Sequence, residues 1–257
     1  ARGEDKNYKD WQSWQHPSTD SPYFKDDVEQ LKKELTYETF AQEYMAAFTT
    51  FSGKVYDLQR DIHVRDDIQY NSSLPTYCSI DFGYRMPSVG WYQVDFKYEK
   101  PRVYVIDEIC FEENIRTEEL ARMIKEKQYP VLTYYGDPAG AGTQAQSGIG
   151  DIEIFRQHGM RVRYKTDRIS RNIPNGVSLL RSWFNDANGD PHIFFASHCK
   201  GAIESTENYR YPEKKADQRL KEEPLKDGRY DHFCDQMRYM FVNLFGIKQK
   251  QAGVIDW

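Results

Sequence analysis

The sequence lacks several features that would assign it to common protein classes. No apolar run approaches the roughly 18 residues that a membrane-spanning helix needs, and residues 1–20 are polar and charged, unlike a secretory leader. The four cysteines form no CxxC pair, which argues against a zinc site or a disulfide framework. We therefore expect no membrane association, and buried thiols in a reducing compartment such as a cytoplasm.

Two further absences concern nucleotides and nucleic acids. The chain contains no GxxxxGK[ST] phosphate-binding loop, so we do not expect it to hydrolyse ATP. Its net charge of −5 also lacks the basic surplus that is typical of proteins that grip nucleic-acid phosphates. A metal-dependent nuclease nevertheless needs a concentrated acidic site, whose local charge is inverted by bound cations. In such an enzyme the basic residues would be concentrated elsewhere on the surface.

The 257 residues, 15% of them aromatic, are enough for a substantial core, and their periodicity predicts the elements around it. Strands are expected over residues 77–82, 90–97, 103–111, 131–135, 160–164 and 192–195. Helices are expected over residues 117–127, 151–158, 173–184, 199–208 and 231–245, with a helical pattern also between residues 25 and 51. Residues 139–150, rich in Gly, Ala, Gln and Ser, are expected to form a mobile loop.

Three antiparallel strands followed by strand–helix units predict an α/β fold. Its sheet would be mixed, with three antiparallel strands and then parallel strands, and flanked by helices. That order is the ribonuclease-H-like arrangement. We assign residues 61–257 to this domain and residues 1–60 to an N-terminal helical linker segment.

Three acids stand where phosphodiester hydrolysis with two metal ions would need them. Asp81 ends an apolar strand, Asp137 ends a later strand before Pro138, and Asp235 lies on the last predicted helix. Such carboxylates would hold two cations roughly 3.5–4 Å apart, which activate water and stabilise the leaving oxygen. The competing structural interpretation is a turn-capping role for Asp81 and a simple Asp-Pro turn at Asp137.

Other polar residues could belong to the same site. Asp231 and His232 share one face of the last helix with Asp235, although Asp231 is also well placed to stabilise the start of that helix. Glu108 follows Asp107 near the end of the third strand, where alternation puts the two acids on opposite faces. Glu108 and Asp231 are therefore secondary candidates.

The segments that carry these acids also form a recognisable series. They are Ile80-Asp81-Phe82-Gly83-Tyr84 with Pro87, Val105-Ile106-Asp107-Glu108, Gly136-Asp137-Pro138-Ala139-Gly140, and residues 231–239 (DHFCDQMRY). With residues 40–44 (FAQEY), Phe48 and residues 53–56 (GKVY) upstream, their order and spacing resemble the nuclease domain of the large terminase subunit of tailed bacteriophages. The resemblance covers residues 20–246, with Gln236 standing where Ala is common in the family.

The resemblance implies a function as well as the ribonuclease-H-like fold. It implies a Mg²⁺- or Mn²⁺-dependent endonuclease, with two ions in the active complex, that cuts double-stranded viral DNA concatemers during genome packaging with little sequence specificity. It makes Asp81, Asp137 and Asp235 the metal-binding acids, with His232 beside them. The setting would be the cytoplasm of the host bacterium.

The missing phosphate-binding loop bears on this resemblance, because complete large terminases carry an ATPase motor before the nuclease. Residues 1–60 would then be the tail of a motor that is absent here, together with the linker. A naturally split protein is the alternative to an excised domain. In the full system, the partners would be double-stranded DNA, the motor domain, the small terminase subunit and the portal.

The best candidate for DNA contact is a basic stretch from Arg156 to Arg171. It includes Arg161, Arg163, Lys165 and Arg168, and it could supply sequence-independent phosphate contacts beside the active site. The alternative interpretation is that this basic sequence is an ordinary solvated edge strand, whose charges protect it from pairing with other chains.

Competing functions are a structure-selective nuclease of the junction-resolvase type, a ribonuclease acting on RNA–DNA hybrids, and a non-catalytic nucleic-acid-binding module.

Overall fold

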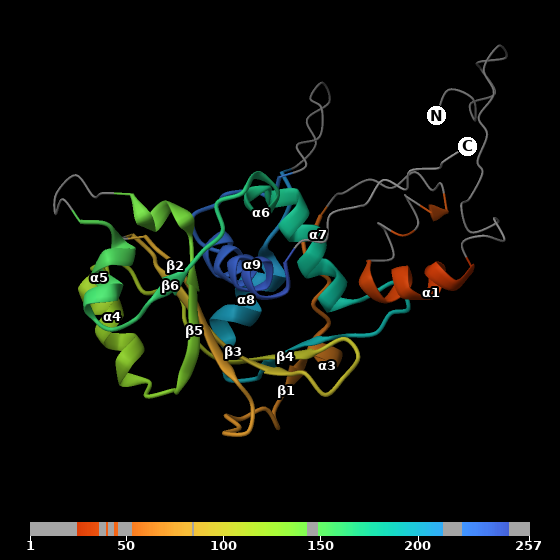
Figure 1. Ribbon diagram of the computed structural model, residues 1–257, viewed down its shortest axis with the longest axis horizontal. Coiled ribbons are helices and arrows are strands. Elements are labelled where there is room, and N and C mark those ends of the chain that lie inside the picture. Colours follow the sequence, from red (N-terminus) through yellow and green to blue (C-terminus); the bar gives the residue numbers. More distant parts are fainter. Residues whose placement is uncertain are drawn as a thin grey trace, which may run out of the picture.

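The computed structural model describes residues 25–35, 40, 44–45, 53–83, 85–142, 149–212 and 223–246. In this part of the chain the central feature is a seven-stranded sheet in the order β1-β7-β4-β3-β2-β5-β6 (Figure 1). The strands are β1 (Val64–Arg65), β2 (Thr76–Asp81), β3 (Ser88–Asp95), β4 (Arg102–Ile109), β5 (Val131–Gly136), β6 (Val162–Arg163) and β7 (Ile193–Ala196).

The pairing of the strands confirms the predicted α/β fold with a mixed, ribonuclease-H-like sheet. Strand β3 pairs antiparallel with both β2 and β4. Strand β5 is parallel to β2, and β6 is parallel to β5. On the other side, β7 is parallel to β4, and the short β1, which the sequence pattern did not predict, is parallel to β7.

Helices cover the sheet from both sides. They are α1 (Lys25–Glu34), α3 (Arg60–His63), α4 (Thr117–Glu126), the 3-10 helix η4 (Pro138–Ala141), α5 (Asp151–Gln157), α6 (Arg168–Arg171), α7 (Ile173–Phe184), α8 (Lys200–Asn208) and α9 (Asp231–Phe245). In Figure 1, α4 and α5 lie on one side of β5 and β6, and α8 and α9 lie on the other. Among the described residues, no helix combines the length and apolar character needed to cross a bilayer. Most of the helical pattern expected between residues 36 and 51, and half of the loop expected at 139–150, lie outside the described residues.

Helix α9 is the element that brings its acidic residues to the sheet. It packs across β2, β3 and β5, and its apolar side chains Phe233, Met237 and Phe241 are fully buried. The hydroxyl of Ser79 on β2 donates a hydrogen bond to the backbone oxygen of Gln236 at 2.6 Å. Gly90 on β3 permits this close approach, because a Cβ there would lie 2.7 Å from Nε2 of Gln236.

The segment before the predicted domain boundary also joins this body from residue 53 onward. Val55 is buried, its backbone N–H donates to Tyr209 at 2.9 Å, and its oxygen accepts from Nε of Arg181 at 2.7 Å. Helix α1 contacts the same body, because the backbone oxygen of Lys32 accepts from the N–H of Ala187 at 2.8 Å. The assignment of residues 1–60 to a linker and motor tail stays a prediction.

Candidate active site

Asp81 and Asp137 meet at the carboxyl ends of two neighbouring strands. In the parallel pair β2 and β5, Ile80 is the partner of Gly136, and each of the two acids is the next residue in its chain. Side chains alternate along a strand, so Asp81 points away from Phe82, whose ring packs against Phe155 of α5. Asp81 therefore faces α9.

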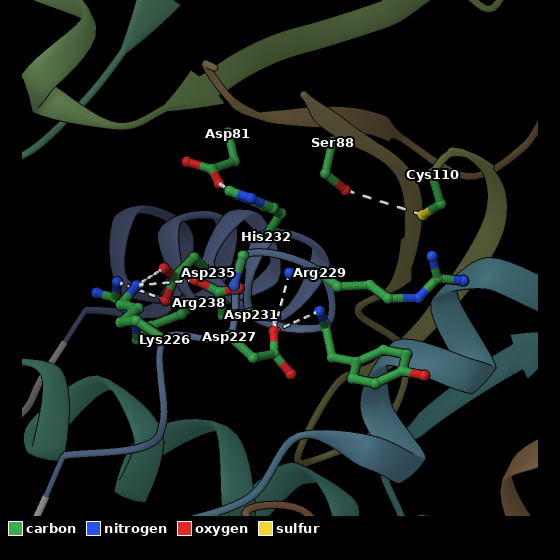
Figure 2. A network of polar contacts seen from close by, with 12 residues as sticks. Asp81, Ser88, Cys110, Lys226, Asp227, Arg229, Asp231, His232, Asp235 and Arg238 are labelled. Atoms are coloured by element: carbon green, nitrogen blue, oxygen red, sulfur yellow. Dashed lines mark hydrogen bonds and ion pairs between the residues drawn. The ribbon is translucent and has the colours of Figure 1, made fainter. Parts of the chain in front are cut away.

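The carboxyl group of Asp81 is buried, with 7% of the residue exposed, and it accepts a hydrogen bond from Nδ1 of His232 at 2.8 Å (Figure 2). Burial raises the pKa of Asp81 to about 6, the hydrogen bond with His232 opposes this rise, and the negative charges of Asp235 and Asp137 add to it. In return, the hydrogen bond to Asp81 raises the pKa of His232. The carboxyl group of Asp81 and the imidazole of His232 therefore stabilise each other's charged forms in a poorly solvated environment.

Asp235 is also buried, with 3% of the residue exposed, but its partners are cations. Nη2 of Arg238, one helical turn further along α9, donates to Oδ1 at 3.0 Å. The ammonium group of Lys226, which precedes the helix, donates to Oδ2. Figure 2 shows both cations on the same side of Asp235, away from Asp81.

Asp137 lies half-buried at the start of η4 and bonds to its own loop. One of its carboxylate oxygens accepts from the N–H of Ala139 at 2.9 Å, so the turn-capping role that the Asp-Pro pattern suggested is present. The phenol of Tyr239 on α9 lies within electrostatic range of the three acids. Burial raises the pKa of Tyr239, and the charges of Asp81, Asp235 and Asp137 raise it further. All three predicted acids therefore act on one side chain.

Asp231 takes part in the turn that starts α9. Its Oδ1 accepts from the N–H of Gly228 at 2.8 Å, while Oδ1 of Asp227 accepts from the N–H groups of Arg229 and Tyr230 at 2.9 and 2.8 Å. These bonds fix the turn that precedes α9, and Asp231 is the acid in the first turn of the helix, where the helix dipole favours a negative charge. They also support the helix-stabilising interpretation of Asp231.

Glu108 is engaged at the start of another helix. It lies on β4 opposite Gly90, and Gly90 in turn pairs with Ser79, so Glu108 is two strands away from β2 and level with Ser79. Its two oxygens accept from the N–H groups of Gly201 and Ala202 at the start of α8. Burial raises its pKa, and these two backbone bonds oppose the rise. Both oxygens thus already have structural partners.

The donor chemistry of this site fits a hard divalent cation, because Mg²⁺ and Mn²⁺ prefer carboxylate oxygens. A buried acid such as Asp81, whose pKa is raised by burial and by two neighbouring negative charges, is an environment that a divalent cation stabilises. The side chains do not form a complete metal site, however. Within the described ranges, no group of three or more His, Cys, Asp or Glu side chains lies close enough together to hold an ion. Instead, one oxygen of Asp81, one oxygen of Asp137 and both oxygens of Asp235 are bound to partners within the protein.

The predicted basic stretch runs along and beyond β6, at the edge of the sheet. Strand β6 is parallel to β5, with Arg163 paired to Tyr135, so the chain after Arg163 leaves the sheet on the same edge as Asp137. Arg161, Arg163 and Arg168 are exposed. Lys165 differs from them, because its Nζ donates to the backbone oxygen of Val242 near the end of α9 at 2.9 Å. Lys165 therefore has a structural bond, whereas the three arginines remain candidates for DNA contact.

Sequence reasoning assigned no role to Lys226, Arg238 or Tyr239. Arg238 had a usable signal, since a residue three positions after an acid on a helix lies on the same face. No sequence pattern marked Lys226 as a partner of Asp235. It lies before a turn that reverses the chain, and only the folded turn brings its side chain to Asp235.

Comparison with known proteins places these observations in a family context, although no family model matches the chain. The large terminase subunit of Escherichia phage T5 is 24% identical in an alignment of 251 positions, which covers 93% of this chain and 53% of that protein. The chain therefore spans about half the length of this curated relative.

Solved structures give the same result for the fold. The large terminase of a thermophilic bacteriophage, in complex with ATP-gamma-S, superposes with a TM-score of 0.67 at 19% identity, covering 94% of this chain and 58% of that one. The large terminase nuclease domain of bacteriophage SPP1 with bound Mn superposes with a TM-score of 0.52 at 15% identity, covering 71% of this chain and 96% of that one. The resemblance to terminase large subunits, and within them to the nuclease domain, is confirmed.

Proposed function

Proceeding from the resemblance to the nuclease domains of phage terminase large subunits, we propose that this chain is a divalent-metal-dependent DNA endonuclease that acts in viral genome packaging. Its substrate is the double-stranded viral DNA concatemer, which it cuts with little sequence specificity. The observation that carries the proposal is that Asp81 and Asp137 follow paired residues at the ends of the neighbouring strands β2 and β5, while α9 bonds to Asp81 through His232 and carries the buried Asp235 about one turn further on.

In this proposal Asp81, Asp137 and Asp235 hold two Mg²⁺ or Mn²⁺ ions. Bound ions would supply an activated water and stabilise the leaving oxygen of the phosphodiester. His232 keeps Asp81 oriented through its Nδ1 hydrogen bond, which leaves the second oxygen of Asp81 available. The bound Mn in the SPP1 nuclease domain supports the use of a divalent ion.

The wider assembly is part of the same proposal. Residues 1–60 would link the nuclease to an ATPase motor, and the complete system would include the small terminase subunit and the portal in the host cytoplasm. The large terminase of the thermophilic bacteriophage holds a nucleotide analogue, and this chain covers 58% of it, which supports a motor outside the present sequence.

Cleavage of supercoiled plasmid by the purified chain tests the activity. Nicking and linearisation are expected with Mn²⁺ or Mg²⁺ and not with EDTA. Asp81→Asn and Asp235→Asn are expected to lower the rate by at least about 100-fold, because each removes a metal ligand. Asp107→Asn is the control, since Asp107 is half-buried and ion-paired to Lys127 at 2.8 Å but is not one of the three acids.

A substrate panel of one sequence separates the competing activities. Linear duplex, a four-way junction and an RNA–DNA hybrid are compared at equal concentration. Cutting of the duplex at a rate comparable to the junction supports the proposal. Cutting of the junction alone indicates a resolvase, and cutting of the hybrid alone indicates a ribonuclease. Metal-independent cleavage, or full activity of Asp81→Asn, contradicts the assigned site.

A further inference from the structure

The two carboxylate oxygens of Asp235 have different kinds of partner. Oδ1 accepts from Nη2 of Arg238 at 3.0 Å, whereas Oδ2 accepts from the ammonium group of Lys226. The side chain of Arg238 is 6% exposed, and that of Lys226 is 49% exposed. One oxygen is therefore bound to a cation enclosed in the protein and the other to a cation that borders solvent.

Arg238 is held firmly in place. Its stem lies against Gly176 of α7, where a Cβ would stand 2.8 Å from both Cγ and Cδ of the arginine. Its guanidinium group also lies over the ring of Tyr239, 4.7 Å from the centroid. Because a buried charge that loses its partner is strongly destabilising, we expect Arg238 to keep its bond to Oδ1 in every state of the site.

Hydrogen bonds on both sides hold the backbone of Lys226 beside Asp235, whereas its half-exposed side chain can move into solvent. On one side the N–H of Leu225 donates to the backbone oxygen of Arg210 at 2.8 Å, and on the other Asp227 and Asp231 bond to the turn before α9. The ammonium group also lies 3.9 Å from Oδ2 of Asp231. A half-exposed lysine regains hydration and rotamer freedom when its ion pair opens, so this pair costs little to break.

We propose that Lys226 acts as a stand-in cation that occupies Oδ2 of Asp235 and must be displaced when a divalent ion binds. This inference rests on the proposed metal-dependent function. Since Arg238 retains Oδ1, Asp235 offers the ion one oxygen, and that oxygen is the one held by Lys226. The lysine neutralises a buried carboxylate in the metal-free protein and lowers the affinity for the ion by competition.

Calorimetric titration of the whole chain with MnCl₂, without DNA, tests this competition. Lys226→Ala and Lys226→Met are expected to tighten the Kd for Mn²⁺ by about two- to tenfold, as expected for removal of a half-exposed competing ion pair. Lys226→Met retains the apolar stem and serves if Lys226→Ala does not fold. Lys127→Ala is the matched control, because it removes a similarly accessible lysine from an acid, Asp107, outside the three predicted ligands.

The outcomes separate this inference from the proposed function. If Mn²⁺ binds the wild type and binding is abolished in Asp81→Asn, but Lys226→Ala and Lys226→Met have the wild-type Kd, the competition is refuted while the nuclease site stands. Weaker Mn²⁺ binding in both Lys226 variants also refutes it. If neither the wild type nor the Lys226 variants bind Mn²⁺, the proposed function itself fails. Tighter binding in both Lys226 variants, with Lys127→Ala unchanged, establishes the competition.

Discussion

The carboxyl group of Asp81 lies where the protein disfavours its charge. It is almost fully buried, and the negative charges of Asp235 and Asp137 act on it from two other elements. His232 compensates only in part, because the pKa of Asp81 remains raised to about 6. A charged carboxylate in this position is costly for folding at neutral pH, and the proposed cation site would offset that cost.

This environment predicts how Asp81→Asn changes stability with pH. The folded-state pKa of Asp81 lies above the unfolded value, so the free energy of unfolding falls as pH rises from about 4 through about 6. The contribution of His232, whose pKa is raised, likewise disappears as pH rises through its folded-state value. In EDTA at about pH 8, Asp81→Asn is expected to be about 1–2 kcal/mol more stable than the wild type, because the gain from removing the charge exceeds the cost of losing the His232 bond.

Urea denaturation at about pH 4.5 and about pH 8 measures this effect. The stability difference between variant and wild type should be larger at the higher pH. Comparing the two proteins at each pH cancels the exposed acids, such as Asp67 and Glu153, whose pKa values are lowered by arginine partners and which act in the opposite direction. A variant that is less stable than the wild type at the higher pH argues that Asp81 is a structural acid.

At the scale of elements, the site depends on how closely α9 approaches the sheet. Strand β2 provides Asp81, the turn after β5 provides Asp137, and α9 provides His232 and Asp235. The close approach of Gly90 and Gln236 sets the distance between the helix and the strands. A change at the contact between Gly90 and Gln236 would therefore move His232 and Asp235 together, because both lie on α9.

Gly90→Ala tests this dependence. The new methyl group would stand 2.7 Å from Nε2 of Gln236 and from the hydroxyl of Tyr92, so helix or strand must shift. We expect a loss of about 1–3 kcal/mol in the free energy of unfolding, as for other overpacked cores, together with weaker Mn²⁺ binding. Gly83→Ala is the control, because no described atom lies within 4 Å of its added Cβ, and its effect should stay within about 0.5 kcal/mol. Equal stability of the two variants in chemical denaturation contradicts this role for Gly90.

At the scale of the whole molecule, the charges must be unevenly placed if an acidic protein is to bind DNA. Of the exposed arginines, Arg163 ends β6 beside Tyr135, near the edge of the sheet that carries Asp81 and Asp137. Arg161 directly precedes β6, and Arg168 begins α6 after the chain has left the sheet at that edge. Lys97 follows β3 at the opposite edge, because β3 runs antiparallel to β2. The proposed DNA path therefore runs over one edge of the sheet.

A triple variant, Arg161→Ala with Arg163→Ala and Arg168→Ala, tests the path. If each arginine neutralises one phosphate, the slope of log K against log salt should become shallower by about 0.9 for each arginine replaced. The control triple replaces the exposed Lys97, Arg122 and Lys125, which changes the net charge by the same amount. Fluorescence anisotropy with a short duplex gives both slopes. Equal slopes for the two triples exclude a specific basic edge.

Much of the fold follows from local patterns in the sequence. The apolar strands around Ile80 and Val105, and the helical spacing of Phe233, Met237 and Phe241, predict elements that the structure contains. Alternation and helical period are imposed by burial of one face, so they are legible in a single chain. The two-residue strand β1 was not predicted, and β6 was predicted too long, over residues 160–164. Such short strands depend on pairing with a neighbouring strand rather than on a pattern of their own.

By itself, the sequence determined the identity of the acids and the elements that carry them, since an acid at the end of an apolar strand is visible without coordinates. Only the tertiary structure decided three of the carboxylate partners: His232 for Asp81, the α8 start for Glu108, and Lys226 for Asp235. These partners come from distant or reversing parts of the chain. Hydrogen bonds and ion pairs act over a few ångströms in space, and separation along the sequence carries no record of such distances.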